Sequence, residues 1–274
     1  MQMLCALLVF QTSELPARLT ELSPWLEMQT APRDEVVAAL DAQEHRRFIK
    51  SHTPLDGLPY DERVTYICVG RDPRDVAVSW DNHFENVNLE VFIGARAAAV
   101  GLDDLPEIMP DGPPIPSADP QERFWQWIDA DTPPDGGMSS LRGTLEHLSS
   151  FWDARGEPNV ALFHYADLQA DLEGETRRLA AALGITVEEG QMAGLVSAAT
   201  FDSMRGRAQA LAPEVQVDGF WNDTSRFFHV GTSVQWQRFM AAEDVTRYEA
   251  RVAALAPPDL AAWAHAGKQA LAST

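Results

Sequence analysis

The 274-residue sequence predicts an α/β protein in which helices flank a central parallel sheet. Two short runs, 64–69 and 160–164, are rich in β-branched and aromatic residues, as buried parallel strands are. Each run is followed by a segment whose apolar residues recur with the period of a helix. Strands that alternate with helices form a parallel sheet covered by helices. We expect one such domain over residues 1–274.

Further helices are predicted from apolar periodicity and from the residues at their ends. A helix at 172–183 stops before Gly184, which suits a left-handed cap. Asp34 and Glu35 suit the first turn of another helix, where acidic side chains complement the dipole. The other predicted helices cover 1–10, 32–42, 141–152 and 245–255.

The chain is strongly acidic, with 21 Lys and Arg against 41 Asp and Glu and a formal net charge of −20. A field of this sign repels nucleic acid and anionic membranes, so we expect neither as a partner. It also disfavours an anionic cofactor unless cations gather locally. Any phosphate-binding site must therefore be a local basic island.

Two features favour a cytoplasmic protein. Cys5 and Cys68 lie inside apolar runs, as buried reduced thiols do. The apolar run 1–10 is too short to span a bilayer, and no cation precedes Arg18. We therefore interpret this run as part of the fold rather than as an export signal.

Residues 63–80 read R-V-T-Y-I-C-V-G-R-D-P-R-D-V-A-V-S-W and predict a strand, a charged turn and a helix. Pro73 suits the first turn of that helix. Ligands of open α/β sheets bind at the carboxyl ends of the strands, so Arg71 leaves the strand where an anion would sit. Ser79 follows two helical turns further on. The alternative is that the arginines of this turn simply pair with its aspartates.

A second motif lies upstream, where residues 46–54 read R-R-F-I-K-S-H-T-P. Phe48 and Ile49 indicate the end of a short strand. Lys50 and His52 alternate, so they project to the same face of an extended segment. For an isolated K-x-H, a solvated lysine beside a structural histidine is the commoner explanation.

These two motifs, in this order, resemble those of the sulfotransferases that use 3′-phosphoadenosine 5′-phosphosulfate (PAPS). The family holds the 3′-phosphate with an Arg at the strand end and a Ser on the next helix, which implies this role for Arg71 and Ser79. Its K-T-H element implies that His52 is the general base and that Lys50 neutralises charge on the transferring sulfonate. The implied reaction is in-line transfer from PAPS to a hydroxyl or amine of a small-molecule acceptor, without a metal. The implied fold is the P-loop-like sulfotransferase fold.

Two further segments resemble the same family in chain order. The Y-A-D-L that follows the second strand implies that Tyr165 contacts adenine. The stretch A-A-T-F-D-S-M-R at 198–205 implies that Phe201 stacks on adenine and that the hydroxyl of Thr200 helps to hold the nucleotide.

Residues 226–236, R-F-F-H-V-G-T-S-V-Q-W, resemble the lid of this family, and we place the lid region at about 205–240. The resemblance implies that Gly231 and His229 contact the cofactor. Two aromatic residues also keep their family positions, Phe227 and Trp236.

The lid departs from the family pattern at two positions. Val230 stands where a cation is usual, and Val234 stands where a second glycine is usual, so a charge and some backbone freedom are lost. A lost charge-assisted hydrogen bond costs ~1.5–3 kcal/mol, which weakens cofactor binding by roughly one or two orders of magnitude. His229 and Arg226 could partly compensate.

The apolar helix at 1–10 resembles the family helix that follows a first strand and a phosphosulfate-binding loop, T-Y-P-K-S-G-T-T-W. The resemblance implies that Met1 falls directly after that loop. We therefore expect a chain that starts late, through an internal start codon, a gene-model error or a real loss, and that lacks the first strand, the loop and its Lys.

The acceptor side is expected in an irregular region at about 88–137, interrupted by an aromatic helix at 124–128. Aromatic side chains in and near this region either line an apolar acceptor pocket or simply pack the region down. They are Phe84, Phe92, Phe124, Trp125 and Trp127.

Three hypotheses about function follow. The first is an active sulfotransferase whose true N-terminus lies upstream of Met1. The second is a non-catalytic nucleotide-binding or scaffold protein derived from this fold, which the expected loss of the loop and the residues Val230 and Val234 favour. The third is an acyl or phosphoryl transferase with His52 as its base. The seven histidines show no ligand spacing, so we expect no metal.

Overall fold

The computed structural model describes residues 1–104, 116–131, 139–211, 218–228 and 231–271. The chain divides into two compact units, each built from three stretches of sequence. The first unit comprises 1–51, 83–114 and 176–231, and the second comprises 52–82, 115–175 and 232–274.

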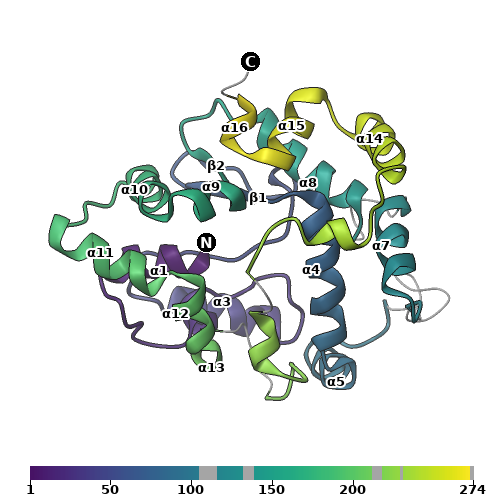
Figure 1. Cartoon of the computed structure of the whole chain (residues 1–274). Coiled ribbons are helices and arrows are strands. Elements are labelled where there is room, and N and C mark those ends of the chain that lie inside the picture. Colours follow the sequence, from purple (N-terminus) through teal and green to yellow (C-terminus); the bar gives the residue numbers. More distant parts are fainter. Residues whose placement is uncertain (105–115, 132–138, 212–217, 229–230, 272–274) are drawn as a thin grey trace. The chain divides into compact units, whose positions relative to one another are not determined.

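The described elements are mostly helices (Figure 1). Those of the first unit are α1 (Gln2–Phe10), α2 (Leu19–Leu22), α3 (Arg33–Asp41), α5 (Leu89–Ala99), α11 (Glu189–Ala198), α12 (Phe201–Gly206), α13 (Ala208–Leu211) and η3 (Thr224–Phe227). Those of the second are η1 (Leu55–Gly57), β1 (Tyr66–Gly70), α7 (Pro120–Asp129), α8 (Leu141–Asp153), β2 (Val160–His164), α9 (Tyr165–Ala170), η4 (Gln235–Arg238), α14 (Asp244–Leu255), α15 (Pro258–Ala266) and α16 (Lys268–Leu271). Two helices cross a unit boundary, α4 (Pro73–Asn86) and α10 (Leu172–Ala182).

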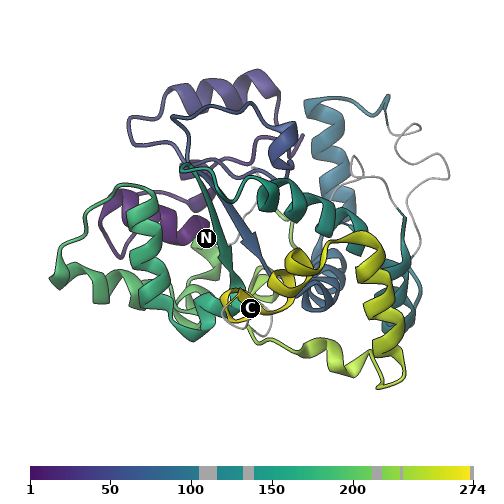
Figure 2. The same ribbon diagram turned by 90° about the horizontal axis from the view of Figure 1, so that it is seen from above.

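The described strands, β1 and β2, form the predicted parallel sheet in the second unit (Figure 2). Their register pairs Tyr66 with Val160 and Gly70 with His164. Tyr66 and Cys68 are buried, so one face of β1 packs into the core. The prediction of an α/β protein with a parallel sheet flanked by helices is confirmed. The strand β1 begins two residues later than predicted, because Val64 belongs to a turn in which its N–H bonds to the Asp61 carbonyl.

Helices α8, α14 and α15 pack around this sheet within the second unit. The predicted apolar face of α8 is buried. Trp152 on α8 lies 5.4 Å from Trp263 on α15, measured between ring centroids, and its indole donates to the Asp259 carboxylate. Phe124 and Trp127 of α7 are buried in the same core, so for these two residues the packing explanation is confirmed.

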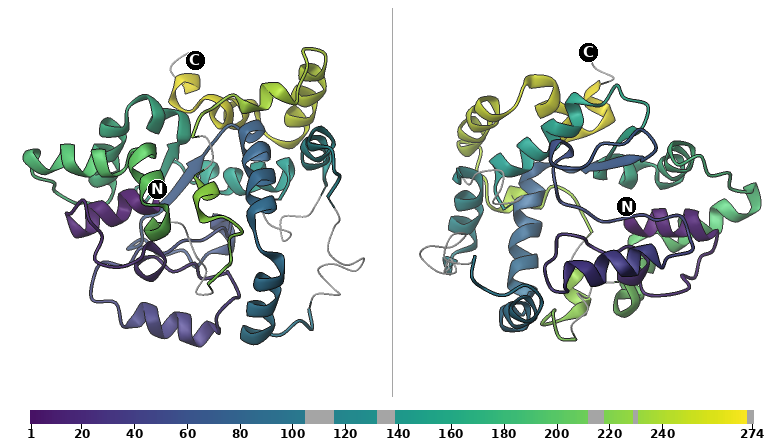
Figure 3. Two further views of the ribbon diagram at one scale, coloured as in Figure 1. Left: turned by 60° about the horizontal axis from the view of Figure 1, so that its bottom comes forward. Right: turned by 180° about the vertical axis from the view of Figure 1, so that it is seen from behind.

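In the first unit, α1 is apolar on most of its faces, and Met3 to Leu8 are buried. It packs against α2 and α11, near the purple end of the chain in Figure 3. Phe92 of α5 is partly buried and packs on a small cluster of Phe220 and Trp221. Within the described ranges, no helix combines the length and the apolar character that crossing a membrane requires.

The expectation of an irregular region at 88–137 was wrong in part. Residues 89–99 form α5, because Asn88 caps the helix by accepting from the Val91 N–H and the run is rich in helix-forming alanine. The aromatic helix is longer than predicted, since Asp119 caps α7 and Pro120 occupies its first position. Residues 105–115 and 132–138 lie outside the described residues.

The expected strand end near Ile49 is only a single parallel bridge, between Lys50 and Trp25.

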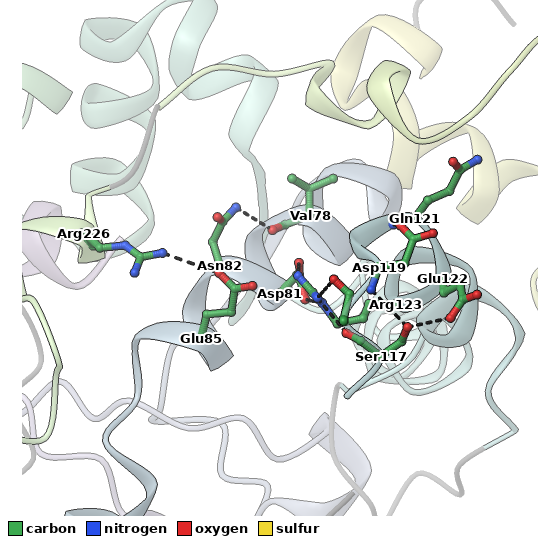
Figure 4. A network of polar contacts seen from close by, with 11 residues as sticks. Val78, Asp81, Asn82, Glu85, Ser117, Asp119, Gln121, Glu122, Arg123 and Arg226 are labelled. Atoms are coloured by element: carbon green, nitrogen blue, oxygen red, sulfur yellow. Dashed lines mark hydrogen bonds and ion pairs between the residues drawn. The ribbon is translucent and has the colours of Figure 1, made fainter. Parts of the chain in front are cut away.

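Figure 4 shows ion pairs that Asp81 and Glu85 of α4 make with arginines outside the helix. In the second unit, Arg123 binds both carboxylate oxygens of Asp81, at 2.5 and 2.9 Å, and so joins α7 to α4. In the first unit, Arg226 lies 3.6 Å from Glu85. The side-chain amide of Asn82, also on α4, donates to the carbonyl of Val78 one turn earlier, at 2.9 Å.

We predict that Gly70→Ala destabilises the fold. A Cβ at this position would lie 2.6 Å from Cη2 of Trp263 and 3.0 Å from Cδ2 of His164. Because both rings are held in the core, we expect the free energy of unfolding to fall by about 1–3 kcal/mol, measured by urea denaturation.

Gly194→Ala is the matched control. A Cβ there meets no atom within 4 Å, and alanine favours the interior of α11 by about 0.5–1 kcal/mol. We therefore expect the control to be neutral or stabilising. Equal effects of the two substitutions would contradict the packing explanation.

Candidate functional site

Arg71 lies at the carboxyl end of β1, between the strand and α4. Its guanidinium carbon is 4.6 Å from the centroid of the Tyr165 ring, and its Nη2 donates to the Thr232 carbonyl at 3.5 Å. Its Nε is buried and has no hydrogen-bond partner among the described residues. A buried guanidinium donor that is left unbonded is costly, and an anionic ligand would satisfy it.

The alternative explanation, in which the arginines of the turn pair with its aspartates, holds for Arg74 and not for Arg71. Arg74 binds both oxygens of Asp72, at 2.9 and 2.6 Å. Its guanidinium also lies 3.8 Å from the Trp236 ring centroid. In the described part of the chain, Arg71 has no such carboxylate partner.

The sheet register explains why Tyr165 lies beside Arg71. Gly70 pairs with His164, so the residues that follow them leave neighbouring strands at the same edge. Burial raises the pKa of the Tyr165 phenol, and the charge of Arg71 opposes this effect. The phenol therefore stays protonated at neutral pH and can donate a hydrogen bond.

Asp75, in the first turn of α4, is a residue that the sequence analysis did not assign to the site. Its side chain is 2% exposed. One carboxylate oxygen accepts from the Val234 N–H at 2.8 Å, and the other accepts from the Gln235 N–H at 2.9 Å. Only the tertiary structure shows this contact, because an acidic residue in a first helical turn is ordinary in sequence.

Val234 adopts a left-handed conformation, with φ 61° and ψ 22°. The position that the family gives to glycine therefore has the backbone conformation that favours glycine. For a β-branched residue this conformation costs ~1–2 kcal/mol. Hydrogen bonds to a charged group contribute ~1.5–3 kcal/mol each, so the two bonds to Asp75 are sufficient to offset the strain.

Ser79 and His52 are both exposed and both belong to the second unit. Ser79 lies one helical turn after Asp75 on α4. The backbone of His52 hydrogen-bonds to the ring of His147 on α8, and the Leu55 N–H donates to the Ser150 hydroxyl at 2.9 Å. The loop that carries His52 is thus attached to a core helix.

Lys50 belongs to the first unit, because the unit boundary falls between Ser51 and His52. Its ammonium lies 3.9 Å from the Trp25 ring centroid. Burial lowers the pKa of Lys50 from its ordinary value of 10.5 to about 8, and the charge of Glu27 partly opposes this shift. A lysine in this state is still mostly cationic at neutral pH.

Phe201 and Gly231 lie in contact within the first unit. Gly231 has a φ of +70°, and a Cβ on it would lie 2.7 Å from three atoms of the Phe201 ring. Thr200 caps α12 by accepting from the Ser203 N–H, and its hydroxyl donates to the Ser197 carbonyl at 2.9 Å. His229, the remaining predicted cofactor residue, and Val230 lie outside the described residues.

Comparisons with known proteins agree with the resemblance. The sequence model of the family described as "Sulfotransferase domain" matches residues 3–256. A glycolipid sulfotransferase of Mycobacterium tuberculosis is 46% identical over 277 residues, covering 98% of this chain and 84% of that protein. Human sulfotransferase 2A1 is 22% identical over 249 residues, covering 89% of this chain and 74% of that protein.

Solved structures show the same fold. A retinol dehydratase in complex with androsterone and the inactive cofactor PAP has a TM-score of 0.65 and 20% identity, over 92% of this chain and 75% of that chain. Mouse sulfotransferase SULT7A1 complexed with PAP has a TM-score of 0.58 and 17% identity, over 86% of this chain and 74% of that chain.

The chain belongs to the sulfotransferase family. It is an enzyme that transfers a sulfonate group to a small-molecule acceptor, so the sulfotransferase activity expected in the first of the three hypotheses is confirmed.

We predict that Lys50 titrates near pH 8. The sequence contains two lysines, Lys50 and Lys268, so reductive ¹³C-methylation gives two lysyl NMR signals, which Lys268→Arg assigns. The Lys50 signal should shift with a midpoint of about 8. A midpoint above 10 would contradict its desolvation.

The same shift predicts how stability depends on pH. Between pH 8 and 10.5 the unfolded chain still holds the Lys50 proton that the folded chain has lost. Because the unfolded state binds more protons, the contribution of Lys50 to the free energy of unfolding rises with pH in this window. Lys50→Met should abolish that rise.

Proposed function

We propose that this enzyme uses PAPS as its sulfonate donor and that Arg71 binds the 3′-phosphate of the nucleotide. The observation that carries the proposal is the buried Nε of Arg71, which has no hydrogen-bond partner among the described residues. A phosphate oxygen is a matching acceptor, because a guanidinium can hold phosphate through parallel N–H donors. A similar solved structure, a retinol dehydratase in a complex with retinol and PAP, is consistent with such a ligand.

Other residues take the roles that the family resemblance implies. Ser79 is exposed one turn beyond Asp75 and supplies a hydroxyl to the 3′-phosphate. Tyr165, Thr200 and Phe201 contact the adenosine. Gly231 and His229 contribute from the lid. The ring of Phe201 is supported on one side by the Gly231 backbone.

For the transfer itself, we propose His52 as the general base that removes the proton from the acceptor hydroxyl. PAPS supplies an activated sulfonate, so the protein has to position the acceptor, accept its proton and neutralise charge. His52 is exposed and its backbone is attached to α8, which suits a base that meets an incoming substrate. Lys50, mostly cationic at neutral pH, neutralises charge that develops on the sulfonate.

The acceptor that we propose is a hydroxyl of a glycolipid. A relative that is 46% identical over 98% of this chain is named a glycolipid sulfotransferase. We also propose a cytoplasmic location. Cys5 and Cys68 are buried free thiols, and burial raises the pKa of Cys68 to about 12, so neither is suited to disulfide exchange.

Calorimetric titration with adenosine 3′,5′-bisphosphate and with adenosine 5′-monophosphate tests the nucleotide site. We expect the bisphosphate to bind more tightly. Arg71→Ala should weaken bisphosphate binding by about 10- to 100-fold, because a hydrogen bond to a charged group contributes ~1.5–3 kcal/mol. Monophosphate binding should change little.

Arg63→Ala is the control, since this exposed arginine pairs with Asp61 before the start of β1. It should leave both affinities unchanged. Equal affinity of the wild-type chain for the two nucleotides would contradict a 3′-phosphate site at Arg71.

Transfer of ³⁵S-labelled sulfonate from PAPS to a glycolipid tests the catalytic role of His52. His52→Ala should lower kcat by ~10²- to 10⁴-fold, as the loss of a general base does, and leave the Kd of the bisphosphate unchanged. His45→Ala is the control, because the His45 ring packs on Phe10 in the first unit. A wild-type kcat in His52→Ala would exclude this residue as the base. Equal transfer of the label to the same lipid after its sugar has been removed would exclude the proposed acceptor.

A further inference from the structure

Every residue of the segment 232–236 contacts Arg71, the first turn of α4 or α9. Arg71 donates to the carbonyl of Thr232, Asp75 accepts from the N–H groups of Val234 and Gln235, and Arg74 lies over the Trp236 ring. A further bond joins the Ser233 hydroxyl to Gln169 of α9, at 2.6 Å. The Asp75 side chain, which makes two of these contacts, is buried.

Side-chain packing does not explain the left-handed conformation of Val234. Its side chain is 55% exposed, so few apolar contacts hold it in place. The carboxylate of Asp75, by contrast, is buried and binds two successive N–H groups of the segment. A β-branched residue persists in a left-handed conformation only where the surroundings impose it. Asp75 is the group that imposes it here.

The conformation of this segment determines where the Thr232 carbonyl points. That carbonyl accepts a hydrogen bond from the Nη2 of Arg71, and the centroid of the Tyr165 ring lies 4.6 Å from the guanidinium carbon. Together they restrict the orientation of the guanidinium and leave its buried Nε unbonded. A displaced segment would free Nη2, and the guanidinium would lose its orientation before a ligand arrives.

We propose that Asp75 is a positioning residue of the 3′-phosphate site, which holds the strained segment 232–236 so that Arg71 is oriented before the nucleotide binds. This inference rests on the proposed function of Arg71. Asp75 does not touch the nucleotide. It acts by removing a conformational cost that binding would otherwise have to meet.

Hydrogen exchange tests the structural part without any ligand. In the wild-type chain, the amides of Val234 and Gln235 should be protected, and both should exchange faster in Asp75→Ala. Asp75→Asn keeps the shape of the side chain and can accept only one of the two N–H groups, so one of the two amides should lose protection. Wild-type amides that exchange as fast as those of Asp75→Ala would overturn the inference.

Binding tests the functional part. Asp75→Ala and Asp75→Asn should each weaken binding of adenosine 3′,5′-bisphosphate about tenfold, and binding of the 5′-monophosphate about twofold or less. Asp81→Asn is the matched control, an acidic residue of the same helix that pairs with Arg123 (Figure 4). It should lower stability and leave the preference for the 3′-phosphate unchanged.

A second substitution separates positioning from a general loss of structure. Val234→Gly removes the conformational cost at this residue, so in the Asp75→Ala background it should restore bisphosphate affinity to within about threefold of wild type. A purely structural role of Asp75 predicts no such rescue, and its absence would overturn the proposal. Selective binding that is lost in Arg71→Ala and kept in Asp75→Ala would overturn the inference alone. A wild-type chain that does not distinguish the two nucleotides would overturn both the inference and the proposed function.

Discussion

The parallel pairing of β1 with β2 is the constraint on which the second unit depends. Its register sets Gly70 against His164, so Arg71 and Tyr165 leave the sheet as neighbours. The ring of Trp263 occupies the space that a side chain at position 70 would need. The core that stabilises the sheet therefore also positions the guanidinium of Arg71 and the ring of Tyr165. Both lie at the carboxyl edge of the sheet, where α/β proteins bind ligands.

Two arginines of one turn have different roles because of their neighbours. Arg74 is neutralised by Asp72 and packed on Trp236, so it contributes to structure. Arg71 keeps a buried donor that nothing in the described ranges satisfies. A chain with a net charge of −20 needs such a cation wherever it binds an anion. Strain at Val234 belongs to the same arrangement, since one buried carboxylate compensates for it.

Sequence patterns predicted much of this arrangement. The strand 160–164 was located to the residue, and α10 ends near the left-handed Gly184 as expected. These features depend on local periodicity and on the conformational freedom of glycine, which a single sequence reveals. The helix α5 was missed because turn-forming residues further along obscured its capping Asn88.

The sequence by itself determined the α/β class, the family and the order of the motifs around Lys50, His52 and Arg71, because these depend on residue types at short spacings. Only the tertiary structure decided which arginine keeps an unbonded donor and which acidic residue holds the backbone of Val234 and Gln235. Asp75 and Val234 are 159 residues apart in the chain. Their contact results from packing, and local patterns carry no information about a hydrogen bond between a side chain and so distant a backbone amide.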